Sequence, residues 1–463
     1  MVKTRPTTLL TFLLGLFVLV TGIGTRAYYL NRYSFQEVGP RQVWQVQGHS
    51  VVISPPDTTA LDQLVANIKK DGLHHGFVAQ TPLGPDKPEP TAFIAPLHPL
   101  YRAGLELLAE NYQDTIPFTK TSVVRWVQVV LGGLTCLFYF IIAWRAFGQN
   151  HLLALLVGLA TAVYPYWIIN VAELEDGVLA TFLLAWSLSL GVGIGQKGGV
   201  IRSLIFGIVL AALSLTRASL LPFAVVVQLW LFLRCRQLKN GGACAVMCFL
   251  GFLGGLAPWG YHCYAMLKAP VPLVTSAWFD VWAGNNEAST GGDYQWNMKT
   301  RLPADLVRQL HDTPQAERYA LLADRVLQEV VEHPGETAKR RMRAAMQFLV
   351  GGHAPNLPLF SSGEKTTPPS WWVRPILMIA LPVLFVLAFL GWRWSYGWNT
   401  HSAPVSLAIF WIPLPYLLTH AGPLHSSRLP LDGVLILLAG IGLLAMLPVL
   451  GARLMAGEQV EHE

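Results

Sequence analysis

A short polar stretch between two long apolar runs holds the residues with the clearest chemical potential. Residues 170–180 read NVAELEDGVLA and place Glu173, Glu175 and Asp176 within four positions, in a chain with only 13% charged residues. Carboxylates of this kind can accept a proton from a hydroxyl group or orient one. The structural alternative is that Asp176 caps the following helix while both glutamates are solvated.

A second acidic position opens the stretch DTTALDQLVANIKKDG. Asp57 follows two prolines and precedes apolar residues at helical spacing, so it is a candidate general base and equally a candidate helix cap. Asp62, five residues later, is the alternative base. The apolar positions predict an amphipathic helix on the membrane surface that stops near Gly72.

The composition indicates that most of the chain lies in a membrane. The chain of 463 residues is 53% hydrophobic, contains 16 Trp, and has several apolar runs near 20 residues long, which excludes an ordinary soluble enzyme. We expect an all-α polytopic membrane protein with about ten transmembrane helices. They are predicted near residues 7–24, 123–144, 151–169, 177–195, 202–215, 218–233, 243–261, 374–392, 403–419 and 432–450.

Charge distribution predicts the orientation of these helices. Lys and Arg concentrate in the short connections that lie inside if the N-terminus is cytoplasmic, so the formal net charge of +6 indicates topology and no nucleic-acid partner. The stretch LSLTRASLLP, with Arg217 inside it, predicts a break between two helices. A single long kinked helix is the alternative, and it would invert every later segment.

This topology divides the chain into membrane parts and two polar outer parts. The predicted parts are a first transmembrane helix (1–24), a first outer loop with surface helices (25–122), helices two to seven (123–262), a second outer loop with amphipathic helices (263–373), and helices eight to ten with a cytoplasmic tail (374–463). Both polar parts fall on the outer face, where we expect the function to reside.

Six stretches, in order along most of the chain, resemble GT-C fold glycosyltransferases that use polyprenyl-phosphate sugars. The resemblance is to the bacterial relatives of protein O-mannosyltransferases and of lipid A aminoarabinose transferases. It rests on DTTALDQLVANI, TAFIAPLHPLYRAGLELL, AVYPYWIINVAELEDGVLATFLLAW, GIVLAALSLTRASLLPF, VPLVTSAWFDVWAGNNEASTGG and LHSSRLPLDGVLILLAG. Two departures are WGYHC, where the family often has Trp-x-x-Arg-Asn, and Ser426-Ser427, where it has Arg-Tyr.

The resemblance implies a function on the outer face of the cytoplasmic membrane. A sugar would move from a polyprenyl-phosphate donor to a hydroxyl acceptor on a protein, lipid or glycan, with inversion. Asp57 would be the general base, with the 173–176 acids orienting the acceptor or the base. Membrane lipids are the other expected partners. The competing predictions are a transporter or flippase, and an inactive subunit of an envelope-glycan assembly complex.

Other polar residues are candidate substrate contacts. Arg217 and Arg428 could hold a phosphate through their forked guanidinium groups, although snorkelling towards lipid headgroups is the structural alternative for both. The remaining candidates for sugar or phosphate contacts are His98, His262, Asn285 and Asn286. A divalent metal between the acids and a histidine is conceivable, but no metal-ligand motif demands it, so we expect none.

Overall fold

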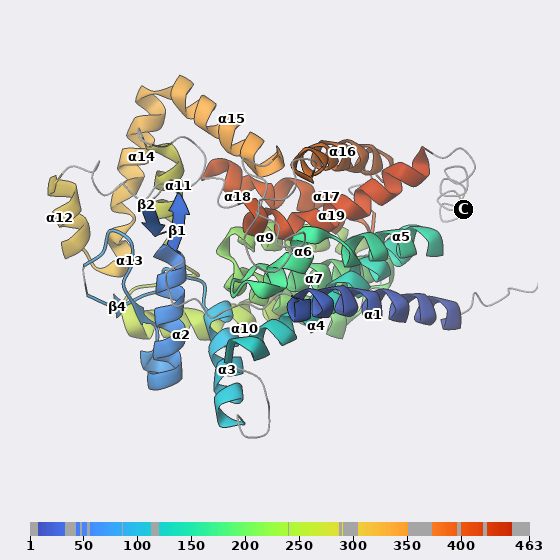
Figure 1. Cartoon of the computed structure of the whole chain (residues 1–463), viewed down its shortest axis with the longest axis horizontal. Coiled ribbons are helices and arrows are strands. Elements are labelled where there is room, and N and C mark those ends of the chain that lie inside the picture. The colour runs from blue at the N-terminus through green and yellow to red at the C-terminus, as the bar shows by residue number, and fades with distance from the viewer. Residues whose placement is uncertain are drawn as a thin grey trace, which may run out of the picture.

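The computed structural model describes most of the chain and is mainly helical (Figure 1). The described residues are 8–32, 43–46, 49–52, 56–85, 87–112, 120–238, 240–286, 289, 304–350, 373–395, 400–419 and 424–446. The end of the predicted cytoplasmic tail, after residue 446, lies outside them.

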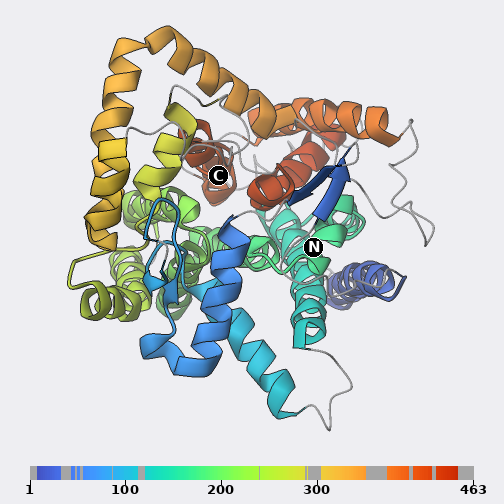
Figure 2. The same ribbon diagram turned by 60° about the vertical axis from the view of Figure 1, so that its left-hand side comes forward.

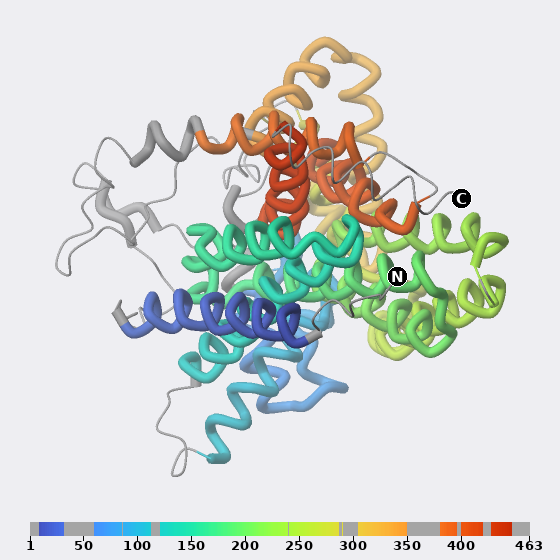
Figure 3. The backbone as a smooth tube through the Cα atoms, turned by 90° about the vertical axis from the view of Figure 1, so that its right-hand side faces the viewer, coloured from blue at the N-terminus to red at the C-terminus, as the bar shows by residue number. Residues whose placement is uncertain are grey.

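Apolar helices form a bundle whose members run roughly side by side, with α1 alongside α4 and α5 (Figure 3). The long members are α1 (Thr8–Arg32), α4 (Lys120–Ala146), α7 (Gly177–Lys197), α9 (Leu221–Arg234), α10 (Gly241–Leu267), α16 (Val373–Trp394) and α19 (Leu424–Ala445). The shorter ones are α5 (His151–Ala162), α6 (Pro165–Ile169), α8 (Val200–Thr216), α17 (Ala403–Trp411) and α18 (Pro413–Leu418).

Length and composition identify the chain as a multi-pass membrane protein. Within the described ranges, six helical segments are long and apolar enough to cross a membrane, and α5 with α6, bent by 51°, can form a seventh span. Three further apolar helical segments, at 200–216, 380–394 and 403–418, are shorter. Each of the ten predicted segments coincides with an apolar helix, but ten spans remain a prediction.

Glycines allow the closest helix contacts in the bundle. A Cβ atom at Gly207 of α8 or at Gly251 of α10 would collide with the backbone of the other helix. The same holds for Gly391 of α16 and Gly442 of α19. Small residues of this kind let membrane helices approach closely, since lipid supplies no hydrophobic drive for helix association.

The predicted break at Arg217 is confirmed. Helix α8 ends at Thr216, Arg217 has an extended backbone with φ −143°, and the short helix η2 (Ala218–Leu220) leads into α9. Pro222 in the first turn of α9 suits a helix start, because it lacks the N–H that an interior position would need. The alternative of one long kinked helix is therefore wrong.

The elements from both polar parts gather at one end of the bundle, opposite the start of α1 (Figure 1). The first part contributes β1 (Val43–Val46), β2 (His49–Val52), α2 (Pro56–His75), β3 (Val78–Ala79), β4 (Glu89–Pro90) and α3 (Leu97–Asn111). The second contributes α11 (Ala277–Asn285), α12 (Ala304–Asp312), α13 (Gln315–Arg318), α14 (Leu321–Glu332) and α15 (Pro334–Val350). Figure 2 shows α14 and α15 meeting at a corner along the rim of this assembly.

The predicted amphipathic helix exists as α2, and Gly72 interrupts it with a positive φ of 74°. Its apolar residues Leu64 and Val65 are almost fully buried, in a cluster with Phe77 and with Trp259 of α10. The apolar face of α2 therefore packs against other parts of the chain. It does not face a membrane surface as we expected, because Trp259 and its neighbours offer a protein surface to cover.

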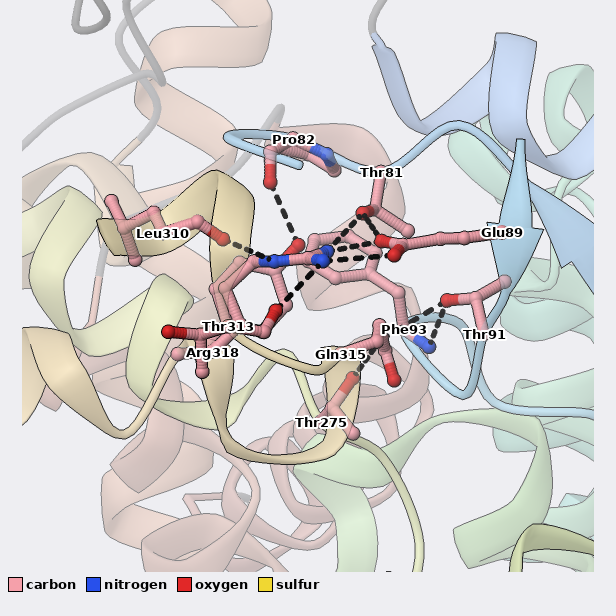
Figure 4. A network of polar contacts seen from close by, with 11 residues as sticks. Thr81, Pro82, Glu89, Thr91, Phe93, Thr275, Leu310, Thr313, Gln315 and Arg318 are labelled. Carbon is pink, nitrogen blue, oxygen red and sulfur yellow. Dashed lines mark hydrogen bonds and ion pairs between the residues drawn. The ribbon is translucent and has the colours of Figure 1, made fainter. Parts of the chain in front are cut away.

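A buried polar network joins the two polar parts (Figure 4). Arg318, whose side chain is 1% exposed, donates to both carboxylate oxygens of Glu89, with Nη2 at 2.8 Å from Oε2. Thr81 donates to Glu89 at 3.0 Å, and the Tyr319 hydroxyl donates to the carbonyl of Pro82 at 2.7 Å. The two polar parts, far apart in sequence, therefore form one packed body.

Replacing Arg318 tests whether this network holds the two parts together. Arg318→Met should lower the free energy of unfolding by about 3 kcal/mol, because it strands the Glu89 carboxylate in a buried place. Adding Glu89→Gln should recover part of that loss. Chemical unfolding in detergent micelles provides the measurement, and Arg325→Met, at an exposed arginine of α14, is the matched control. Equal stability of Arg318→Met and the control would contradict this role.

Candidate functional site

Three of the predicted site residues come together where the elements of the two polar parts meet the bundle. Arg217, in the break between α8 and α9, donates from Nε to Oδ2 of Asp176 at 2.8 Å and from Nη2 to Oδ1. Asp176 directly precedes α7. The ring of His98, in the first turn of α3, lies close to the backbone carbonyl of Glu175. Three segments distant in sequence thus meet through polar side chains.

Asp176 uses its carboxylate for this ion pair and not as a helix cap. It occupies the N-cap position of α7 but makes no side-chain capping hydrogen bond. Burial by itself would raise the pKa of Asp176, yet the adjacent Arg217 guanidinium lowers the pKa below its ordinary value. Asp176 is therefore ionised at neutral pH. Of the other two acids, Glu173 is exposed and Glu175 is half-buried.

A tyrosine and a serine extend the pair towards α18. The Tyr416 hydroxyl lies 3.5 Å from Nη1 of Arg217 and 2.9 Å from the hydroxyl of Ser219. The ring of Tyr416 stacks on Phe348 of α15 with centroids 5.3 Å apart. Arg217 is therefore positioned both by the apolar bundle and, through Tyr416 and Phe348, by α15 of the second polar part.

His98 is buried beside these charges, with 3% of its surface exposed. Burial lowers its pKa to about 4, and the Arg102 and Arg217 guanidinium groups act in the same direction, while Asp176 opposes them. The ring is therefore neutral at physiological pH. Within the described part of the chain, Nε2 of His98 and the hydroxyl of Tyr101 have no hydrogen-bond partner.

The predicted alternative base, Asp62, belongs to a charged network between α2 and α3. Its Oδ1 lies 2.6 Å from Nη1 of Arg102, which also donates from Nε to Glu106 at 2.8 Å. Lys69 completes the network at 3.1 Å from Glu106. Asp62 is thus engaged in fixing α3 against α2. The backbone of Asp57 lies in the first turn of α2, but its side chain lies outside the described residues, so its catalytic role stays a prediction.

Arg428 forms a second buried ion pair, with a partner that the sequence analysis missed. Its Nε donates to Asp432 Oδ1 at 2.7 Å, and both side chains are 2% exposed. Asp432 also accepts a hydrogen bond of 2.8 Å from Tyr164, and Arg428 lies over the ring of Tyr166 at 5.6 Å. The i,i+4 spacing of Arg and Asp in an apolar helix is the signal that could have identified Asp432.

The last turn of α15 links the two ion pairs. Nη1 of Arg428 lies 3.4 Å from the carbonyl of Leu349, while the preceding Phe348 stacks on Tyr416, which contacts Arg217. Both predicted phosphate-binding arginines are therefore buried in protein contacts, and neither extends freely to lipid headgroups as the snorkelling alternative requires.

The remaining predicted residues lie in structural contacts. The Asn285 amide donates to Val281 at 2.7 Å and to Leu418 at 2.9 Å, so it attaches the end of α11 to α18. The Asn286 amide donates to Trp282 at 2.9 Å. His262 stacks on Trp259 with centroids 5.3 Å apart, in the cluster under α2.

A fourth arginine, Arg26, lies inside the bundle and was not among the predicted site residues. It is fully buried, and Nη1 donates to the carbonyls of Gly22 at 2.8 Å and Ala162 at 3.2 Å. Arg26 and Asn170 line a small pocket, and no described residue bonds the Asn170 amide. An arginine inside a 25-residue apolar helix was the available signal.

No group of three His, Cys, Asp or Glu side chains converges among the residues that the structure describes. Whether the protein needs a divalent metal stays a prediction, as does the sugar donor.

In comparisons with known proteins, no family model matches this chain, and no curated protein matches it.

The depressed pKa of His98 predicts a loss of stability in acid. The unfolded chain binds a proton near pH 6.5, whereas the folded chain resists it until about pH 4. Stability should therefore be full above pH 6.5 and fall by up to about 3 kcal/mol as the pH drops to 4. Unfolding of the unsubstituted chain and of His98→Gln across this range measures the difference. The same acid loss in both proteins would contradict the assignment.

Removing one member of the Asp176 and Arg217 pair should lower the free energy of unfolding by more than removing both members would suggest. Asp176→Asn leaves a buried guanidinium without its counter-ion, which typically costs about 3 kcal/mol. The loss of stability in the double variant Asp176→Asn/Arg217→Gln should be smaller than the sum of the two single losses by about 1–3 kcal/mol. The exposed pair Glu336 and Lys339, treated in the same way, should show no measurable coupling. Additive losses at the buried pair would be inconsistent with this interpretation.

Proposed function

We propose that this protein is an integral membrane glycosyltransferase that moves a sugar from a polyprenyl-phosphate donor to a hydroxyl acceptor. The observation that carries the proposal is the meeting of His98, Asp176 and Arg217 at the junction between the apolar bundle and the outer assembly. A lipid-linked donor needs such a junction, because its tail stays in the bilayer while its charged head must reach polar groups. The ordered resemblance to the GT-C family supports the same reaction.

The proposed chemistry needs one base and one cation. The acceptor hydroxyl gives its proton to the Asp57 carboxylate, and its oxygen forms a bond to the anomeric carbon as the bond from that carbon to the phosphate oxygen breaks. The electron pair of the broken bond leaves on the phosphate, which arginine stabilises. Attack from the opposite side inverts the anomeric carbon. No second carboxyl group is needed to protonate a leaving group that departs as a stable anion.

The ion pair gives Arg217 and Asp176 connected roles in this proposal. A phosphate that binds the guanidinium competes with the Asp176 carboxylate for the same donors, because each group can present two anionic or acceptor oxygens to the guanidinium fork. Donor binding would then loosen Asp176 from Arg217. The released carboxylate would orient the acceptor hydroxyl near the base.

The proposed location is the cytoplasmic membrane of the cell, with the site on the outer face. The support is the concentration of Lys and Arg in connections at the other end of the bundle. The sugar and the acceptor, whether protein, lipid or glycan, are not specified by these residues.

A transporter or flippase is the second candidate, and two features favour it. Helices α5 and α6 form a broken pair bent by 51°, and Arg428 with Asp432 is a buried ion pair inside an apolar helix. Asp432 comes eight residues after the start of the 22-residue α19. At about 1.5 Å per residue it lies roughly 12 Å along a helix about 33 Å long, which is close to the middle of that helix. This candidate ranks second because no second half of the sequence mirrors the first, as the paired halves of many transporters do.

An inactive subunit of an envelope-glycan complex is the third candidate. The observation that favours it is that Arg217 and Arg428 each already have a carboxylate partner, so neither cation is uncompensated before substrate arrives.

Transfer from labelled polyprenyl-phosphate sugars, with membranes that contain the protein, tests the proposal. Label should move to a new lipid, glycan or protein, and Asp57→Asn should slow the transfer by about 10²–10⁴-fold through loss of the base. Asp71→Asn, at an exposed acid on the same helix, should transfer at the unsubstituted rate.

The other outcomes separate the alternatives. Undiminished transfer by Asp57→Asn would move the base to Asp62 or to the 173–176 acids. No transfer from any donor would reject the enzyme in favour of a transporter or an inactive subunit, and vesicle uptake of the same lipids would distinguish those two.

A further inference from the structure

The surroundings of His98 assign the proton of its neutral ring to one nitrogen. The ring lies close to the backbone carbonyl of Glu175, which favours a proton on the side that faces it, and Nε2 has no partner among the described residues. The proton is therefore assigned to Nδ1. A neutral imidazole carries one proton, and therefore Nε2 presents a lone pair. This acceptor is held in place, because the first turn of α3 between Pro96 and Pro99 is buried with the ring.

A second polar group without a partner lies on the same face of α3. Tyr101 is one turn after His98, their ring centroids are 6.1 Å apart, and the Tyr101 hydroxyl has no hydrogen bond within the described ranges. Buried polar atoms are rarely left without partners, because each costs roughly 1–3 kcal/mol. Two such atoms on one face of α3, with His98 also close to Asp176 and Arg217, mark a place where a ligand supplies the missing contacts.

We infer that Nε2 of His98 accepts a hydrogen bond from a hydroxyl group of the sugar-bearing substrate, with the Tyr101 hydroxyl as a neighbouring contact. The inference rests on the proposed function and assigns one part of its site. The hydroxyl can belong to the donor sugar or to the acceptor, and the two sources share the same chemistry at Nε2.

The lone pair decides between a hydroxyl group and a phosphate. A phosphate oxygen brings negative charge and lone pairs towards Nε2, so it finds no proton there to accept. A hydroxyl group brings the hydrogen that Nε2 lacks. His98 therefore recognises the sugar or acceptor side of the reaction, and phosphate recognition is left to arginine.

The same environment excludes His98 as the general base. Burial lowers its pKa to about 4, and a base this weak takes a proton from a hydroxyl group poorly at neutral pH. His98 is accordingly a positioning residue that orients the hydroxyl, and the base remains a carboxylate.

The two nitrogens of His98 have separable roles, and two substitutions separate them. His98→Asn retains an N–H donor near the position of Nδ1, which preserves the contact with Glu175, and removes the group at the position of Nε2. His98→Gln places a polar amide near Nε2. A structural histidine tolerates the Asn variant, whereas a substrate contact at Nε2 does not.

The experiment measures kinetics and binding for both variants, with His333→Asn at an exposed position as the control. His98→Asn should keep its thermal midpoint and raise KM for one substrate about tenfold, the usual size of one lost hydrogen bond, with a smaller change in kcat. His98→Gln should restore part of the loss. Binding of the labelled polyprenyl-phosphate sugar is also measured without acceptor. If His98→Asn weakens this binding, the hydroxyl belongs to the donor. If the binding is unchanged while KM for the acceptor rises, the hydroxyl belongs to the acceptor.

Failure of this inference and failure of the proposed function give different results. If the unsubstituted chain transfers sugar and His98→Asn matches it in both KM values and in donor binding, His98 is structural and the transferase stands. If the unsubstituted chain neither binds nor transfers any donor, the function itself is rejected together with the inference. Should neither His98 variant fold, Tyr101→Phe decides, and KM values and donor binding unchanged from the unsubstituted chain would overturn the inference.

Discussion

A buried charge must have a partner, and this requirement organises the site. Arg217 lies where α8 ends, in extended backbone, and is mostly buried at the edge of an apolar bundle. The energetic cost of removing a guanidinium from water is repaid only by close and well-oriented counter-charge. Asp176 supplies it, which fixes the start of α7 against the break between α8 and α9. The turn before α7 then presents the Glu175 carbonyl to His98, so one contact of α3 depends on the same ion pair, in addition to the network that fixes α3 against α2.

Buried arginines with compensating partners also connect other parts of the molecule. Arg318 with Glu89 joins the two polar parts, and Arg428 with Asp432 faces the last turn of α15. Arg26 differs, because backbone carbonyls of its own helix and of α5 accept its hydrogen bonds. Carbonyl dipoles compensate a charge less completely than a carboxylate does. Arg26 is therefore the least compensated of these four cations among the described contacts.

The parts that could be predicted from the sequence depend on local patterns. Apolar run lengths located the apolar helices, and Arg217 within LSLTRASLLP correctly placed a break. The helical spacing of α2 predicted its existence but not its surroundings, since an apolar face covered by protein and one covered by lipid have the same pattern. The contact between Glu89 and Arg318 spans 229 positions, and no local pattern encodes it.

Within the site, the sequence identified the residue types but not their pairing. The 173–176 acids, His98 and Arg217 were all candidates, yet only the fold shows that Arg217 selects Asp176 and that the backbone of Glu175, not its carboxylate, binds His98. Asp432 was missed because a single acid near the start of an apolar helix resembles a helix-end charge. Its significance comes from Arg428 four positions earlier and from Tyr164, which is 268 positions away.

Charge pairing before substrate arrives has a consequence for the strength and selectivity of binding. A ligand that binds Arg217 must replace contacts that Asp176 already makes, so its affinity is the difference between two favourable interactions. A carboxylate offers little advantage over Asp176. The donor phosphodiester also carries one negative charge, but it has more acceptor oxygens, and it gains a second charge as the sugar leaves. The pair thus favours the departing phosphate over ordinary carboxylates. The neutral His98 beside it adds a requirement for a hydroxyl group, and only a ligand that carries both phosphate and hydroxyl groups satisfies the whole cluster.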